Sequence, residues 1–156
     1  MKSEKELTMP HKLYVFVNTD LKSMTPGKAM AHSGHAANHA AHIMNMGVNG
    51  KRLIEEWGDE LGFGTQINVY APWAEVRTLI YQHINRHYCG LVTDPSYPFE
   101  ADTELAKYLP SDITPIYKGN GRSIFFRKQE TAAWVFVADG CDITLASIMA
   151  AYPLAQ

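Results

Sequence analysis

The strongest constraint on the fold is the order in which short apolar runs alternate with helix-forming segments. The run KLYVFVN, residues 12–18, is nearly continuous in apolar and β-branched residues, which is the pattern of a strand buried on both faces. Further strands are predicted at residues 65–71, 90–94 and 132–140. This alternation predicts an α/β fold, a three-layer sandwich in which a mixed, mostly parallel sheet of about four strands carries helices on both faces.

Helices are predicted between and after these strands, at residues 28–47, 51–61, 73–88 and 143–152. Pro72 suits the start of the third helix, and Asp142 is expected to cap the last one. Residues 1–11 form a polar lead-in, and residues 12–156 are expected to be a single α/β domain. The segment 95–131 is rich in Pro and Gly and weakly patterned, so we expect an inserted excursion there, either an elaborated loop or one with a helix around residues 102–108.

Composition excludes several classes of protein. A formal charge of −2 and a pI near 6.4 exclude a strongly basic protein that wraps nucleic acid, although a local basic patch remains possible. The sequence has no apolar run long enough for a membrane span, and its start lacks the apolar core of a secretory signal. We therefore expect a cytoplasmic protein with no membrane partner. Its two cysteines, Cys89 and Cys141, can form at most one disulfide and are expected to be free, buried thiols.

Histidines crowd onto the first predicted helix. Four of the seven histidines of the chain lie there with a lysine, at Lys28, His32, His35, His39 and His42. At 100° per residue these side chains fall within an arc of roughly 80°. The opposite face carries small or flexible residues that are expected to pack on the sheet, at Met30, Ala37, Ala41 and Met44. The stripe begins beside the loop that leaves the first strand, where ligand sites gather in α/β sheets and where free backbone N–H groups favour an anion or an oxyanion.

Three readings of this stripe are open. For His39 and His42, more than a turn from the loop, we expect a solvated surface, whereas His32 and His35 lie close enough to the loop to act in a site. Three imidazoles on adjacent turns also admit a metal ion, but no carboxylate or thiolate that fixes its geometry is evident nearby. We therefore expect neither a metal ion nor a cofactor.

The segment TDLKSMTPGKAMAHSGHA, residues 19–36, resembles the signature of the type II peptidyl-tRNA hydrolases. The residues that carry the match are Asp20, Leu21, Lys22, Gly27, Lys28, His35 and Ala36. His32 stands where that family usually has glutamine. The later run GLVTD resembles the strand of the family that ends in an aspartate, with Asp94 at that position. The resemblance implies a fold of the type II peptidyl-tRNA hydrolase kind.

The sequence also departs from the family pattern. After the aspartate the family typically has Ala-Gly-X-Thr, whereas this chain continues with PSYP, residues 95–98. The threonine, which is a proposed active-site residue of the family, is thus absent, and Ser96 is the hydroxyl that can stand in for it. The long excursion and a helix after the last strand are further differences.

The resemblance implies an esterase that cleaves the bond between a peptide and the 3′ ribose of tRNA. This reaction needs an activated water, a stabilised oxyanion and a grip on phosphate. The implied catalytic residues are Lys28 for the oxyanion or a phosphate, His32 or His35 as the base, and Asp94 to orient the base or pair with a lysine. The implied substrate-binding residues are Lys22, Asp20 and Ser96.

The implied partner is a peptidyl-tRNA or another RNA terminus, and a homodimer is expected because the family commonly dimerises. Two alternatives stay open. One is a non-catalytic relative that binds RNA, a small ligand or a protein. The other is a different hydrolase that uses the histidine face to cleave a phosphoester or an amide.

Overall fold

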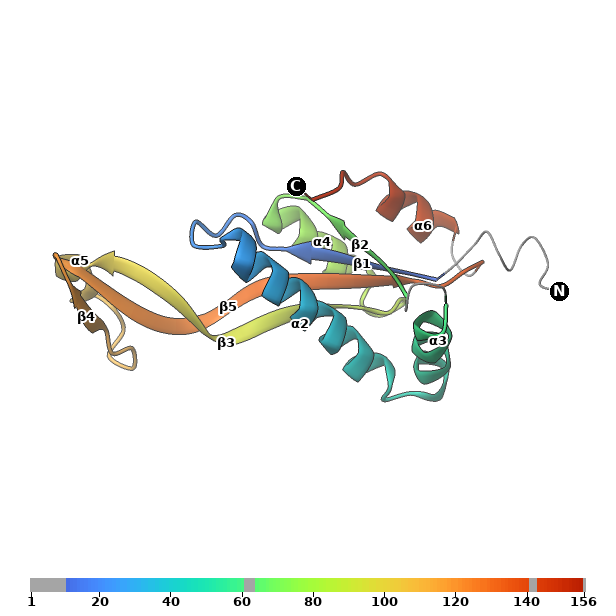
Figure 1. Ribbon diagram of the computed structural model, residues 1–156, viewed down its shortest axis with the longest axis horizontal. Coiled ribbons are helices and arrows are strands. Elements are labelled where there is room, and N and C mark those ends of the chain that lie inside the picture. The colour runs from blue at the N-terminus through green and yellow to red at the C-terminus, as the bar shows by residue number, and fades with distance from the viewer. Residues whose placement is uncertain (1–10, 61–63, 141–142, 156) are drawn as a thin grey trace. The chain divides into compact units, whose positions relative to one another are not determined.

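The computed structural model describes residues 11–60, 64–140 and 143–155 of the chain (Figure 1). These residues form two compact units, one made of Thr93–Glu130 and the other of the remaining described residues. The strands are β1 (Lys12–Val17), β2 (Thr65–Val69), β3 (Cys89–Asp102), β4 (Ile116–Gly119) and β5 (Arg122–Val137). Because of their length, β3 and β5 contribute residues to both units.

The strands join in one sheet in the order β2–β1–β5–β3, and β4 pairs with β5. β1 is parallel to β2 but antiparallel to β5, and β4 is also antiparallel to β5. The sheet is therefore mixed, as predicted, but mostly antiparallel, so the prediction of a mostly parallel sheet was wrong. The reason is the route into β5, which follows β4 through a tight turn, whereas parallel neighbours need a crossover connection.

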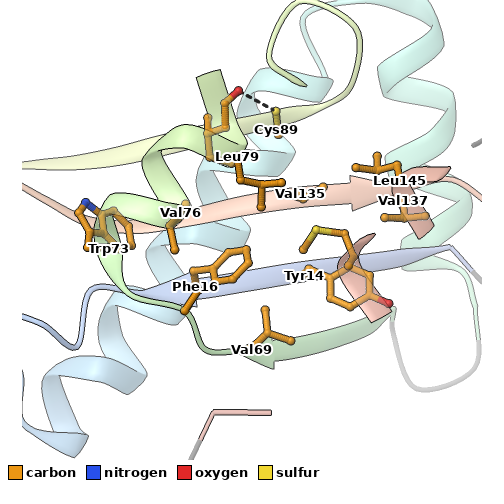
Figure 2. Close-up of a cluster of buried hydrophobic side chains, with 14 residues drawn as sticks. Tyr14, Phe16, Val69, Trp73, Val76, Leu79, Cys89, Val135, Val137 and Leu145 are labelled. Carbon is orange, nitrogen blue, oxygen red and sulfur yellow. Dashed lines mark hydrogen bonds between the residues drawn. The ribbon is translucent and has the colours of Figure 1, made fainter. Parts of the chain in front are cut away.

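Helices cover both faces of the sheet in the first unit, which confirms the three layers. The helices are α2 (Pro26–Met44), α3 (Val48–Gly58), α4 (Trp73–His83) and α6 (Ile143–Ala150). Leu13 and Val15 of β1 face a cluster with α2 and α3, while Tyr14 and Phe16 face a second cluster with α4 and α6. Figure 2 shows the second cluster, in which the sulfur of Cys89 also lies 3.9 Å from the carbonyl oxygen of Ile80. A strand with both faces buried explains the unbroken apolar run in the sequence.

The packing of the first cluster explains why residue 90 is a glycine. Trp134 of β5 is fully buried there, and a Cβ on Gly90 would lie 3.1 Å from the Nε1 atom of Trp134. The strand next to β5 therefore carries glycine where the indole needs room.

The second unit replaces the predicted loop with strands. β3 continues to Asp102, and the helix expected around residues 102–108 is a single turn, α5 (Thr103–Ala106), whose Glu104 N–H bonds to the Asp102 carboxylate at 2.9 Å. The β4–β5 turn contains Asn120, a non-glycine residue with a φ of +54°. Inside the unit, the ring of Phe99 stacks on Phe125 with their centroids 5.5 Å apart.

Several predictions fall at the ends of the described segments. The predicted cap Asp142, the second cysteine Cys141 and most of the lead-in lie outside the described residues. Cys89 is a buried free thiol, as expected. The third helix was predicted to reach residue 88 but ends at His83. Among the described helices, none combines the length and the apolar character that crossing a membrane requires.

Candidate functional site

The amino end of α2 follows directly from the loop after β1. Thr25 is the N-cap, and its hydroxyl oxygen accepts a hydrogen bond from the backbone N–H of Lys28 at 3.3 Å. Pro26 occupies the first helical position, which its fixed φ favours, so the helix begins two residues before the predicted start. The loop and the cap together hold Lys28 in the first turn.

The face of α2 that packs on the sheet differs from the predicted one. Its buried residues are His32, Ser33, Ala36, Ala40 and Met44, whereas Met30 is 78 % exposed. The prediction that Met30 belongs to the packing face was therefore wrong. The two alanines, one helical turn apart, let the helix approach the sheet closely and so decide which face turns inward.

Lys28, His32 and His35 share one margin of α2 in its first three turns. His32 is only 6 % exposed, whereas His35 is exposed and Lys28 is half-buried. The rings of His32 and His35 meet edge to face, with their centroids 5.2 Å apart. A shielded imidazole thus lies beside an imidazole that water reaches, an arrangement suited to moving a proton.

His39 is not the solvated surface residue that was expected. Its Nδ1 atom accepts a hydrogen bond of 2.8 Å from the indole Nε1–H of Trp134, and the two rings pack edge to face. Burial, and to a lesser extent the nearby His42, lowers the pKa of His39 below its usual value. The sequence held no local signal for this contact, because its partner lies 95 positions further along the chain. His42 is exposed, as expected.

The loop residues of the signature have separate roles. The Asp20 carboxylate accepts a hydrogen bond of 2.8 Å from the backbone N–H of Trp73, at the amino end of α4. The N-cap of α4 is Pro72, which makes no side-chain cap bond, so Asp20 caps this helix from a distant loop. Lys22 is exposed in the same loop.

Asp94 and Ser96 both lie on β3 within the second unit. The Asp94 carboxylate accepts a hydrogen bond of 2.8 Å from the backbone N–H of Ser96, a local turn-like contact. The sequence pattern predicted that this strand ends at Asp94. In the structure it continues to Asp102, so that prediction was wrong.

An open cleft of about 490 Å³ lies at the carboxyl ends of the parallel strands β1 and β2. This is the edge at which α/β sheets commonly bind ligands. Its lining residues are mostly apolar, at Val15, Val17, Thr19, Pro26, Ala29, Met30, Ser33, Asn68, Val69, Tyr70 and Ala155. Ser33 lies about 100° around α2 from His32, so the cleft opens on the margin of the helix opposite to the histidines.

A small polar network orients the amide of Asn68 in this cleft. The Gln66 Nε2 group donates to the Ser33 hydroxyl at 2.9 Å and to Asn68 Oδ1 at 3.1 Å, and the Ser33 hydroxyl donates to Asn68 Oδ1 at 3.3 Å. The Asn68 oxygen is thus doubly occupied, and its NH2 group remains available as a donor. Gln66 and Asn68 are two residues apart on β2, so their side chains lie on the same face of the strand. This polar spacing is visible in the sequence.

Within the described ranges, no three His, Cys, Asp or Glu side chains are grouped so that they could hold a metal ion.

Residues 11–72 match the family model described as "Peptidyl-tRNA hydrolase PTH2". This range contains the whole first signature, including Asp20, Lys28 and His35, and it ends before Asp94 and Ser96. No curated protein matches the chain.

Proposed function

We propose that the chain, whose residues 11–72 match the family model "Peptidyl-tRNA hydrolase PTH2", belongs to that family and cleaves the ester between a peptide and the 3′ ribose of tRNA. The observation that carries the proposal is the amino end of α2. There a half-buried lysine, Lys28, is followed one turn later by the His32–His35 pair, with ring centroids 5.2 Å apart.

The proposed reaction begins with the attack of a water molecule on the ester carbonyl carbon. One imidazole of the His32–His35 pair takes a proton from the water as the new C–O bond forms. The Lys28 ammonium and the positive end of α2 stabilise the oxyanion of the tetrahedral intermediate. When the bond to the ribose oxygen breaks, the imidazolium returns its proton to that leaving oxygen, which becomes the 3′ hydroxyl. The peptide carboxylic acid that forms then releases the second proton of the water to solvent and remains as a carboxylate.

The cleft on the other margin of α2 supports a place for the peptide part of the substrate. Its walls are apolar, and the NH2 group of Asn68 is a donor suited to a peptide carbonyl oxygen. Lys22, exposed in the loop before α2, is a suitable cation for the phosphate backbone of tRNA.

The test is turnover of an N-acetylated aminoacyl-tRNA by the wild type, by Lys28→Ala and by Lys51→Ala. Lys51 is a matched control because it is an exposed lysine on α3. Loss of one oxyanion-stabilising group lowers the rate by about 10²–10³-fold, which is the expectation for Lys28→Ala, while Lys51→Ala keeps the wild-type rate. Equal rates for all three proteins remove Lys28 from the mechanism, and no turnover by folded wild type refutes the esterase.

Asp94 and Ser96 are proposed contributors that the same assay tests as Asp94→Asn and Ser96→Ala. The sequence after Asp94 lacks the threonine of the family, which favours a second candidate function, a non-catalytic relative that binds an RNA terminus. Binding of tRNA that weakens steeply with salt but gives no turnover identifies that alternative. The homodimer stays a prediction, which light scattering on the purified protein tests.

A further inference from the structure

A second open cavity, of about 550 Å³, lies in the first unit near the carboxyl end of α2. It is lined by His39, Ile43, Asn49, Ile84, Asn85, Arg86 and the neighbouring residues 87–91. His39 and Ile43 come from α2, Asn49 comes from α3, and the remaining residues form the connection from α4 into β3. None of the residues proposed above for catalysis or peptide binding lines this cavity.

Three polar side chains of the cavity can donate hydrogen bonds, those of His39, Tyr88 and Arg86. Since Nδ1 of His39 accepts from Trp134, a neutral His39 carries its proton on Nε2 and can only donate from that atom. The Tyr88 hydroxyl accepts a hydrogen bond of 3.2 Å from Asn49, which leaves its own hydrogen to donate. Arg86 adds a guanidinium with its five donors.

The side chains of the lining that can carry a charge near neutral pH are basic, although the whole chain carries a formal charge of −2. The lining contains an arginine and two histidines but no Asp or Glu. Arg86 follows the end of α4, where a cation offsets the negative end of the helix, but it forms no ion pair with any residue that the structure describes. Its charge therefore remains available to a ligand.

The rest of the lining is apolar or aromatic. Ile43, Ile84 and Leu91 supply aliphatic walls, and the rings of His87 and Tyr88 supply flat faces. Such faces suit the stacking of a nucleobase or a similar planar group. A lining that combines hydrogen-bond donors with apolar walls and rings suits a ligand that has both an anionic group and a flat body.

We propose that this cavity is a second binding site, separate from the esterase site, for a nucleoside monophosphate unit. Arg86, the Nε2–H of His39 and the Tyr88 hydroxyl bind the phosphate, while the aliphatic walls and the rings hold the base. The unit can come from a free nucleotide or from the phosphorylated end of an RNA, and the experiment separates these two sources.

The experiment is titration calorimetry of the wild type with AMP, adenosine, inorganic phosphate and a 5′-phosphorylated triadenylate. We expect AMP to bind at least about tenfold more tightly than adenosine or phosphate alone, because each of these lacks one half of the contacts. Arg86→Gln is expected to weaken AMP binding about tenfold and Tyr88→Phe by a few-fold. Arg77→Gln is the matched control, because Arg77 is an exposed arginine of α4 that does not line the cavity.

Tighter binding of the triadenylate than of AMP assigns the site to an RNA end, and the reverse order assigns it to a free nucleotide. Either order supports the shared chemistry. AMP binding no tighter than that of adenosine and phosphate overturns the proposal, as does equal binding by Arg86→Gln and the wild type. These measurements involve no hydrolysis, so their outcome is independent of the esterase assay.

Discussion

The contact between Asp20 and α4 decides whether the signature aspartate is a structural residue or a substrate-binding one. Its carboxylate accepts a hydrogen bond of 2.8 Å from the backbone N–H of Trp73 and so caps α4, whose own N-cap residue Pro72 makes no side-chain cap bond. The bond also fixes the loop that leads from β1 to Lys28. Asp20→Ala should therefore destabilise the fold even in the absence of any substrate.

The magnitude follows from the type of contact. Loss of a capping oxygen at a helix amino end costs about 1–2 kcal/mol, part of which comes from the charge facing the helix dipole. A chain of 156 residues unfolds with an entropy of about 330 cal/mol/K, at roughly 2.1 cal/mol/K per residue. The melting temperature should thus fall by about 3–6 °C in Asp20→Ala. Asp20→Asn keeps an acceptor oxygen but loses the charge, so its shift should be about half as large.

Thermal unfolding followed by circular dichroism measures both shifts. Asp112→Ala is the control, because Asp112 is an exposed aspartate that forms no ion pair with any described residue. The reasoning is refuted if Asp20→Ala melts within about 1 °C of both the wild type and the control. A raised KM at unchanged stability would instead identify Asp20 as a substrate-binding residue.

Four further predictions concern the contacts around the two cavities. Trp134→Phe should cost about 2–4 kcal/mol in urea unfolding, since it leaves the half-buried Nδ1 of His39 without its donor and opens a gap around a fully buried side chain. Trp57→Phe, which loses a bond of 2.9 Å to a carbonyl oxygen from a half-buried side chain, should cost less. Because burial lowers the pKa of His39 in the folded state, the unfolded chain binds more protons, so stability should fall as the pH drops below about 6.5, and His39→Gln should flatten this slope in urea titrations at several pH values. Asn68→Ala should raise KM for a peptidyl-tRNA several-fold with little change in kcat, which steady-state kinetics measures, and an unchanged KM argues against the peptide cleft. Since burial raises the pKa of Cys89 to about 11, this thiol should resist maleimide at pH 8 until denaturant is added, as mass spectrometry can detect.

The layers of the fold could be predicted because the sequence encodes burial directly. Leu13 and Val15 alternate with Tyr14 and Phe16, and all four are buried, which requires apolar layers on both sides of β1. Strand direction is encoded less directly. It depends on the turn before β5, where Asn120 adopts a left-handed conformation. It also depends on the length of β3 and β5, which was not predicted because the Pro and Gly residues of the segment 95–131 indicated a loop.

The site could be predicted where neighbours in sequence are neighbours in space. The signature loop and the first turns of α2 are such a case, and they fall inside the matched range. The contacts of Asp20 with Trp73 and of His39 with Trp134 join segments 53 and 95 positions apart. No periodicity within either segment indicates such a partner, so these roles became visible only with the fold.

The histidine stripe shows what helical spacing can and cannot determine. On a regular helix the spacing fixes the angles between side chains, here an arc of roughly 80°, but it does not fix which side of that arc faces the sheet. The packing of Ala36 and Ala40 sets this phase and divides the stripe lengthwise: His32 and His39, seven residues apart, turn inward, while His35 and His42 stay exposed. Each inner imidazole therefore has an outer one three residues later. The His32 and His35 rings are in contact, and His42 contributes to the lowered pKa of His39. The stripe thus contributes one inner histidine, His32, to the proposed esterase site near the amino end of α2, and another, His39, to the cavity of the proposed nucleotide site near the carboxyl end.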